Sequence, residues 1–214
     1  MSRTRGWIPA LVVAIGLLIP NLAAAQGTPT SEIALPLAPD PARCTVTPKP
    51  KAEIDELYAQ VNPDGVELEP VGTPLPSVIT EDQPVDASTQ TAITELIVTV
   101  LACSANGNHG LADAALLTHE HLVENLREIA RADYEVFYAE NVEPSPPENW
   151  IILYGLHDFR TLPDSRVAVN PDVIVPGVGR FIDTLILKQV DGRWLIDYSQ
   201  EGDGNLYGND IPAQ

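Results

Sequence analysis

The residues best placed for acid–base chemistry are one histidine and one aspartate in two apolar stretches that are predicted to be strands. Alternation along the first stretch puts His157 on the more apolar face, together with Leu153. Alternation along the second puts Asp183 on one face with Leu185. Burial would raise the pKa of the carboxyl group, and a nearby imidazole could relay its proton. The pair is therefore a candidate general acid and base; alternatively, both side chains only make structural hydrogen bonds or face solvent.

Aromatic residues are expected to line an apolar pocket around this pair. Tyrosine hydroxyl groups would lie at the rim of the pocket, from Tyr138, Tyr154 and Tyr198. The full predicted ligand pocket consists of Tyr138, Tyr154, His157, Asp183 and Trp194. Such a pocket would suit a small apolar molecule.

Two stretches resemble metal sites but lack a complete set of ligands. In the run 119–121, His-Glu-His, residues two apart point to nearly opposite sides of a helix, so the two imidazoles would not share one ion. The run 203–208 matches part of a calcium loop, but position 5 is Tyr207 and position 12 is Gln214 instead of Glu. The sequence therefore predicts no metal site. It also lacks nucleotide-binding glycine loops and the Gly-x-Ser-x-Gly elbow, so no cofactor is expected.

The chain as a whole is strongly acidic. Its 214 residues include 30 acidic and 12 basic side chains, which gives a formal net charge of −18. This charge repels nucleic acid and anionic membrane surfaces, so neither is expected as a partner. Hydrophobic residues make up 44% of the chain, a share that excludes a wholly disordered acidic protein.

The N-terminus has the pattern of a secretory signal peptide. Arg3 and Arg5 precede an apolar run over 7–19, and a run of small residues ends at Ala25. The pattern predicts cleavage after Ala25, and hence a secreted or cell-envelope protein that keeps no membrane segment. The alternative is that this segment is retained as an anchor.

Export changes the interpretation of the two cysteines, Cys44 and Cys103. An even number of cysteines in an oxidising compartment favours a disulfide. Because the bond would close a long loop, it would stabilise the fold by about 4 kcal/mol. The alternative is two separate thiols.

Proline density divides the rest of the chain into two parts. Residues 26–87 contain 11 prolines, whereas 88–131 contain none. The first part is predicted to be a proline-rich arm with one short helix near 51–61, and a folded domain is predicted over 88–200. Residues 201–214 are predicted to form a flexible tail.

The domain is predicted to begin with three helices. Apolar residues at helical spacing indicate a first helix that Ser88 caps and the Asn-Gly pair at 106–107 ends. A second, short helix is expected over 111–117, and Thr118 is expected to cap the third.

Strands are predicted after the helices. They are expected over 135–140, 150–161, 166–175, 180–189 and 193–199. The Asp-Gly pair at 191–192 is a strong hairpin signal between the last two strands. Helices followed by hairpin-linked strands indicate an α+β fold rather than a parallel sheet.

Three local segments resemble the nuclear transport factor 2-like superfamily, which includes ketosteroid isomerases, dehydratases and polyketide cyclases. These segments are LACSANGN at 101–108, ALLT at 115–118 and VDGRWLID at 190–197. The resemblance implies N-terminal helices packed on a curved antiparallel sheet, a cystatin-like cone. The arm is similar to that of uncharacterised exported bacterial members in which a second cysteine ends the first helix, which supports the pairing of Cys44 with Cys103.

The resemblance leaves several functions open, because this fold hosts many unrelated activities. The first expectation is a non-enzymatic module whose cone binds a small apolar ligand or a protein. The alternative is an isomerase- or dehydratase-type enzyme that uses Asp183 and His157. A third is a structural envelope protein with a filled cone. Superfamily members often dimerise through the outer face of the sheet, so a homodimer is also expected.

Overall fold

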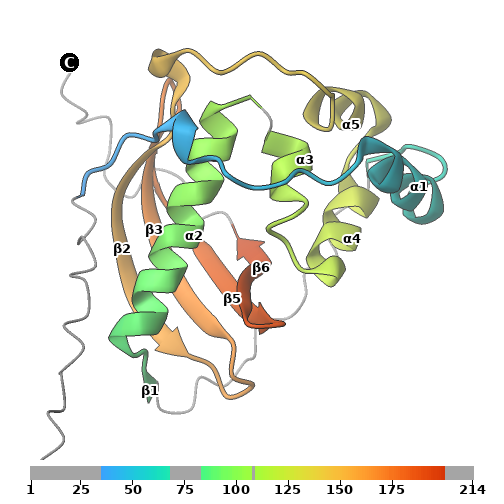
Figure 1. Cartoon of the computed structure of the whole chain (residues 1–214). Coiled ribbons are helices and arrows are strands. Elements are labelled where there is room, and N and C mark those ends of the chain that lie inside the picture. Colours follow the sequence, from blue (N-terminus) through green and yellow to red (C-terminus); the bar gives the residue numbers. More distant parts are fainter. Residues whose placement is uncertain (1–34, 68–82, 108, 201–214) are drawn as a thin grey trace, which may run out of the picture. The chain divides into compact units, whose positions relative to one another are not determined.

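One long helix and an antiparallel sheet organise the residues that the computed structural model describes, which are 35–67, 83–107 and 109–200 (Figure 1). All of them belong to one compact unit that begins at Ile33. The helices are η1 (Pro41–Arg43), α1 (Lys51–Val61), α2 (Ala87–Ala105), α3 (His109–Asp113), α4 (His119–Glu128), α5 (Arg131–Phe137) and η2 (Pro147–Asn149). The strands are β1 (Gln83–Pro84), β2 (Ile152–Thr161), β3 (Val167–Val175), β4 (Gly179–Ile182), β5 (Thr184–Val190) and β6 (Arg193–Gln200).

The strands form one sheet with the order β1-β2-β3-β5-β6, and β4 pairs with the other end of β3. Each of the pairings is antiparallel. The helices α2 to α5 lie between β1 and β2, whereas short turns connect β2 to β6, and the Asp-Gly turn at 191–192 joins β5 to β6 as predicted. The described residues therefore confirm the α+β class.

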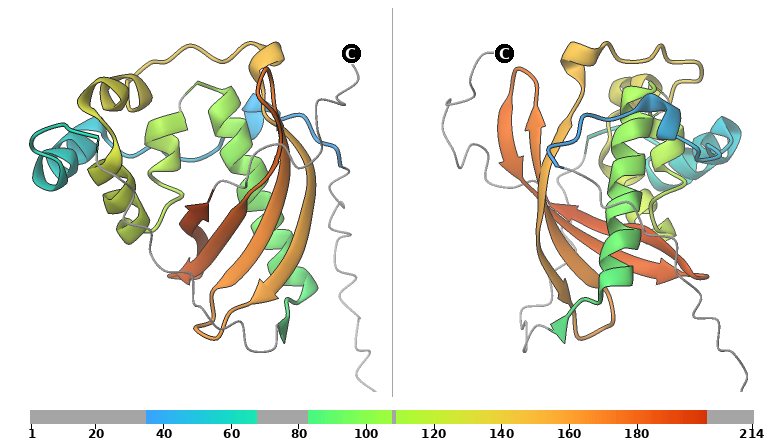
Figure 2. Two further views of the ribbon diagram at one scale, coloured as in Figure 1. Left: turned by 180° about the vertical axis from the view of Figure 1, so that it is seen from behind. Right: turned by 60° about the vertical axis from the view of Figure 1, so that its left-hand side comes forward.

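Helix α2 lies across one face of the sheet (Figure 2). Its apolar stripe packs on inward-facing strand residues; buried members of this cluster include Ile93, Ile97, Leu153, Val169 and Leu187. Asp86 rather than Ser88 caps the helix, because its side chain accepts a hydrogen bond from the Thr89 N–H. The helix ends at Asn106, and Gly107 follows with φ +81°. An added Cβ at Gly107 would lie 2.3 Å from the Glu143 carbonyl oxygen, so only glycine fits there.

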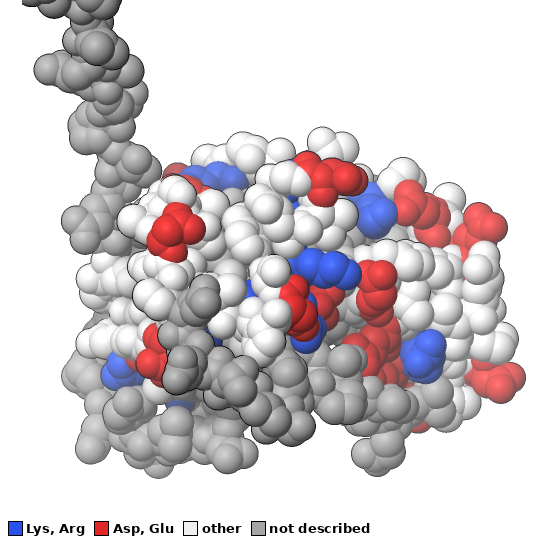
Figure 3. All heavy atoms as spheres, turned by 90° about the horizontal axis from the view of Figure 1, so that it is seen from below, with Lys and Arg blue, Asp and Glu red and all other residues white. Residues whose placement is uncertain are grey.

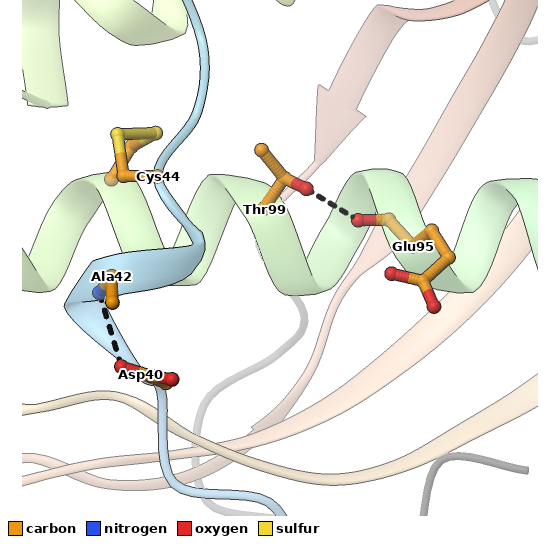
Figure 4. Close-up of a disulfide and its surroundings, with 6 residues drawn as sticks. Asp40, Ala42, Cys44, Glu95 and Thr99 are labelled. Carbon is orange, nitrogen blue, oxygen red and sulfur yellow. Dashed lines mark hydrogen bonds between the residues drawn. A yellow bond between two sulfur atoms is a disulfide. The ribbon is translucent and has the colours of Figure 1, made fainter. Parts of the chain in front are cut away.

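A disulfide between Cys44 and Cys103 ties the segment before α1 to the end of α2. Figure 4 shows this segment crossing α2, with the Asp40 carboxylate accepting a hydrogen bond from the Ala42 N–H. The Arg43 guanidinium pairs with Glu95 on α2. The cysteines are therefore paired, and the segment is held along the helix by covalent and ionic contacts.

The helix expected near 51–61 is α1, and it packs against the other helices rather than standing apart. Ile54 and Tyr58 are both fully buried. The Tyr58 ring stacks on the Tyr134 ring of α5 with centroids 3.9 Å apart, and the Tyr58 hydroxyl donates to the Ile129 carbonyl at 3.0 Å. These contacts form a second apolar cluster, separate from the one between α2 and the sheet.

Two of the predicted strands differ from the structure. The stretch 135–140 is not a strand, because α5 continues to Phe137 and places the rings of Tyr134 and Tyr138, four residues apart, in the second cluster. The stretch 180–189 is two strands rather than one. It breaks at Asp183, whose backbone N–H donates to the Pro171 carbonyl while β4 and β5 pair with different halves of β3.

Strand β2 contains two irregularities that interrupt its alternation. Leu153 pairs with Val173 and Gly155 pairs with Asp172, so Tyr154 is an extra residue at a β-bulge. A second register shift follows His157, where Asp158 has φ +53°. On the other side of β2, Leu37 makes an isolated two-hydrogen-bond bridge to Leu153.

Several predictions concern residues outside the described ranges. The signal peptide at 1–25 and the tail at 201–214 both lie there. Within 35–67, 83–107 and 109–200, none of the helices is long and apolar enough to cross a membrane.

Candidate functional site

The prediction that His157 faces the core is wrong. The bulge at Tyr154 reverses the alternation, so Leu153 points to the core while His157 lies on the opposite face of the sheet. The His157 side chain is 51% exposed, and its Nε2 lies 3.5 Å from Oδ2 of Asp172. Its carboxylate neighbour is thus Asp172 on β3, not the predicted Asp183.

An ion pair occupies the outer face of the sheet next to His157. Asp172 is 1% exposed, and the Arg180 guanidinium holds it in a two-pronged contact, with Nε donating to Oδ1 at 2.7 Å. The same guanidinium lies 4.0 Å from the centre of the Tyr154 ring. The charge of Asp172 is therefore compensated, and Tyr154 belongs to this surface cluster rather than to an interior pocket.

The other predicted pocket residues lie in different places. Asp183 sits at the junction of β4 and β5, where its carbonyl accepts a hydrogen bond from Asn170 at 3.1 Å. Trp194 lines an open groove of about 590 Å³ at the end of β5 and the start of β6, together with Arg166 and Lys188. The five residues predicted to form one pocket therefore do not come together.

Tyr138, in contrast, borders a partly open cavity of about 120 Å³. Its wall is formed by residues from α2, from α5, from β6 and from the stretch that includes α3 and α4. These residues are Val100, Asp113, Leu116, Leu117, His121, Asn125, Phe137, Tyr138, Ile196 and Ser199. Most of these side chains are apolar. The cavity is thus a small, mainly apolar space with a few polar residues in its wall.

Asp113, the last residue of α3, is the most perturbed acid on this wall. Burial raises its pKa from 3.8 to about 7, and its Oδ1 makes no hydrogen bond within the described part of the chain. Burial also raises the pKa of the Tyr138 hydroxyl, and the charge of Asp113 adds to that effect. Asp113 therefore exchanges a proton near neutral pH.

His121 forms the second polar element of the cavity. Thr118 caps α4 by accepting a hydrogen bond from the His121 N–H, which fixes the histidine in the first turn. The His121 side chain is 5% exposed, whereas His119 and Glu120 in the same turn are exposed. Burial lowers the pKa of the imidazole, while Glu124 and Asp197 oppose the shift. Burial therefore favours the neutral form of the ring.

Only one imidazole nitrogen of His121 has a hydrogen-bond partner among the described residues. Nε2 lies 3.3 Å from the Ser199 hydroxyl oxygen on β6. Nδ1 is buried without a hydrogen bond, and the nearest oxygen of Glu124 is 3.9 Å away, beyond hydrogen-bond distance. His121 therefore faces Ser199, another residue of the cavity wall, with one ring nitrogen and the Glu124 carboxylate with the other.

Sequence reasoning recognised Tyr138 but missed Asp113 and His121 as cavity residues. Asp113 is the one charged residue within the apolar run 111–117, LADAALL. A single acidic residue in such an apolar run indicates a buried carboxyl group. A search for hydrophobic periodicity alone does not use this information.

The described residues contain no cluster that could form a metal centre, and one face shows mixed charge. Groups of three or more His, Cys, Asp or Glu side chains with metal-binding geometry do not occur in 35–67, 83–107 and 109–200. On the face shown in Figure 3, Lys and Arg side chains lie next to Asp and Glu side chains rather than together in one patch. Comparison with protein-family models, with curated proteins and with solved structures finds no match to this chain.

Proposed function

We propose that the protein is an exported binding module that holds a small ligand in the cavity bordered by Asp113, His121 and Tyr138. The observation that carries the proposal is a cavity whose mainly apolar wall also contains the polar residues Asp113, His121 and Ser199.

We also propose a nuclear transport factor 2-like cone preceded by a proline-rich arm. The order of helices followed by an antiparallel sheet, with α2 against one face, supports this fold. The Cys44–Cys103 disulfide supports export, because such bonds persist in oxidising compartments. The exported protein would then be secreted or held in the cell envelope, without a membrane segment or nucleic-acid partner. A homodimer would use the outer sheet face around Tyr154.

The second candidate function is an isomerase- or dehydratase-type enzyme. The pair Asp183 and His157 does not support it, because the nearest carboxylate to His157 is that of Asp172. Asp113 and His121 support it instead, since both border one cavity and the pKa of Asp113 lies near neutrality. An enzyme of this class would use Asp113 as the proton-transferring group.

Native mass spectrometry of the protein from an oxidising host tests the binding function. Val100→Phe would fill the cavity from α2, and Val136→Phe is the matched control because Val136 on α5 is 73% exposed. We expect a retained small molecule on the wild type and on Val136→Phe, but not on Val100→Phe. An empty wild-type protein, or equal retention by Val100→Phe, would contradict the proposal.

A further inference from the structure

A serine, a histidine and a glutamate lie beside the cavity in the order of a nucleophile, its base and the acid that orients the base. The Ser199 hydroxyl oxygen lies 3.3 Å from Nε2 of His121. On the other side of the imidazole ring, Oε2 of Glu124 lies 3.9 Å from Nδ1. Serine, histidine and carboxylate groups in this order form the catalytic triads of several unrelated hydrolase folds. Such triads are recognised by their geometry and not by a sequence motif, so they do not require the Gly-x-Ser-x-Gly elbow.

Two elements hold these three groups in place. Thr118 caps α4 and fixes His121 in its first turn, and Glu124 follows three residues later on the same face of the helix. Ser199 belongs to β6. The backbone N–H of Thr118 donates to the Ile196 carbonyl of β6 at 2.8 Å. The start of α4 is therefore joined to the strand that carries the serine, which brings the imidazole within reach of the hydroxyl group.

The neighbours of the imidazole favour the tautomer that a general base requires. A carboxylate beside Nδ1 favours the proton on that nitrogen, which directs the lone pair of Nε2 toward the Ser199 hydroxyl. Burial lowers the pKa of His121, although Glu124 and Asp197 oppose the shift, and so favours the neutral ring. The distance of 3.9 Å is long for a hydrogen bond, but catalytic hydrogen bonds are often long without substrate and shorten around it. His121 is thus oriented to accept a proton from Ser199.

A substrate can reach the serine, because Ser199 is exposed and also lines the cavity. The His121 imidazole is buried, which limits the access of bulk water to the base. Asn125 follows His121 by one helical turn and lies on the same cavity wall. Amide side chains can donate hydrogen bonds to the oxyanion that forms in acyl transfer. The cavity therefore combines a nucleophile, a base and an oxyanion donor.

The rest of the wall limits the size and charge of a substrate. A volume of about 120 Å³ is somewhat smaller than that of an engineered cavity that holds benzene, about 150 Å³, so it accommodates only a short acyl chain. Val100, Leu116 and Ile196 provide apolar surface for this chain. Among the described residues that line the cavity, none is a lysine or an arginine, and the net charge of −18 repels anions. The wall therefore favours an uncharged ester over a phosphate ester or a carboxylate.

We propose that the protein hydrolyses small, uncharged carboxylic esters, with Ser199 as the nucleophile, His121 as the general base and Glu124 as the residue that positions the imidazole. This inference rests on the proposed binding function, because the ester must enter the same cavity, and it adds an activity to that function.

The reaction has two stages, in which His121 moves each proton. In the first, Oγ of Ser199 forms a bond to the carbonyl carbon of the ester while Nε2 of His121 takes the hydroxyl proton. The bond to the alcohol oxygen then breaks, and His121 returns the proton to the departing alcohol. In the second, a water molecule attacks the acyl-serine and gives a proton to His121. The carboxylic acid leaves, and Ser199 regains its proton.

Hydrolysis of p-nitrophenyl acetate by the purified protein tests the activity. We expect turnover and, after acid quenching, an acetyl group on the peptide that contains Ser199 in mass spectra. Ser199→Ala should lower kcat/KM by at least about a hundredfold and abolish the acetylated peptide, because it removes the nucleophile. Ser88→Ala is the matched control, because Ser88 is exposed on α2, and it should retain the wild-type rate.

Nitrogen-15 NMR of the imidazole adds a readout that needs no substrate. We expect the His121 proton on Nδ1 in the wild-type protein. Glu124→Ala should weaken this preference and lower kcat with little change in KM, as is expected of a positioning residue. Glu120→Ala is the matched control, because Glu120 is exposed in the first turn of the same helix, and it should leave the tautomer and kcat unchanged.

Three results would overturn the hydrolase assignment: an unchanged rate in Ser199→Ala, an acetyl group only on other residues, or a wild-type His121 proton on Nε2. The last result would mean that the imidazole donates to Ser199 in a structural hydrogen bond. A ligand retained in native mass spectrometry by the wild type, but not by Val100→Phe, would then leave the binding function standing. Without such a ligand, both proposals are overturned.

Discussion

Asp172, which is buried, and Asp113, which is half-buried with a buried Oδ1, have opposite surroundings. Asp172 on the outer face of the sheet is held by the Arg180 guanidinium, which contacts both carboxylate oxygens. Asp113 borders the cavity, and its Oδ1 makes no hydrogen bond within the described residues. The comparison shows that burial alone does not determine the role of a carboxyl group. A carboxylate beside a fixed cation has a structural role, whereas a carboxylate without such a cation can bind a ligand or a proton.

The fold accounts for this difference. On the paired strands β3 and β4, Asp172 lies opposite Ile182, and Arg180 lies opposite Ile174, two residue pairs away. The pairing of these strands therefore places the arginine next to the carboxylate. Asp113 is the last residue of the short helix α3. The other elements around the cavity contribute His121 and Tyr138 rather than a lysine or an arginine. The following variants test the comparison, beginning with the largest expected effect.

Removing the cation should turn Asp172 into an uncompensated buried charge. We expect Arg180→Met to lower the free energy of unfolding by about 3–5 kcal/mol, the usual cost of breaking a buried ion pair from one side. Urea unfolding measures the loss. The double variant Asp172→Asn/Arg180→Met should recover most of it, and a loss below about 1 kcal/mol in Arg180→Met would show that Asp172 is not held by this pair.

Asp113→Asn should instead remove a pH dependence. Because folding raises the pKa of Asp113 from 3.8 to about 7, the folded state holds the proton more tightly than the unfolded state. The wild type therefore loses stability as the pH rises from about 4 to about 7, by at most about 1.4 kcal/mol per pH unit. Asp113→Asn lacks this slope, so it should match the wild type near pH 4 and exceed it at pH 8. Urea unfolding across this range checks the prediction, and parallel curves would contradict it.

Thr118→Ala tests how the cavity histidine is positioned. Thr118 accepts from the His121 N–H and donates to Asp197 at 3.0 Å, so its loss should cost about 1–2 kcal/mol and shift the His121 ring signals in NMR spectra. Thr91→Ala is the control, because Thr91 is exposed on α2 and donates only to the Ala87 carbonyl of its own helix. Unchanged His121 signals in Thr118→Ala would show that the cap does not position the ring.

The smallest effect is expected for His157→Ala. His157 lies 3.5 Å from Asp172, but half of its side chain is exposed and Arg180 already compensates the carboxylate. The free energy of unfolding should change by less than about 0.5 kcal/mol. A loss comparable to that of Arg180→Met would mean that His157, and not Arg180, is the main partner of Asp172.

Much of the fold could be predicted from local patterns. The stripe of apolar residues in α2, the stop at 106–107 and the cap at Thr118 are local signals, and the structure contains all three. The errors arise where tertiary contacts prevail over local preference. Tyr134 and Tyr138 favour strands by residue type, yet both rings pack in the helical cluster around Tyr58, which requires the spacing of a helix.

The candidate site was harder to predict, for a physical reason. A single extra residue, Tyr154, moves His157 to the other face of the sheet, and nothing in an alternating pattern reveals a bulge in advance. The actual cavity combines Asp113, His121, Tyr138 and Ser199 from separate elements. Their proximity depends on how α4 and α5 pack beside β6, which is a property of the tertiary structure.

The bridge between Leu37 and Leu153 has a consequence for self-association. A strand at the edge of a sheet offers free N–H and C=O groups, to which a strand of another molecule can add. On β2, Leu37 occupies one end of this edge, and β1 pairs with Thr161 and Arg160 at the other. The stretch between these pairings contains both register shifts of β2. The edge therefore lacks the long, regular run of backbone groups on which amyloid-like aggregation begins.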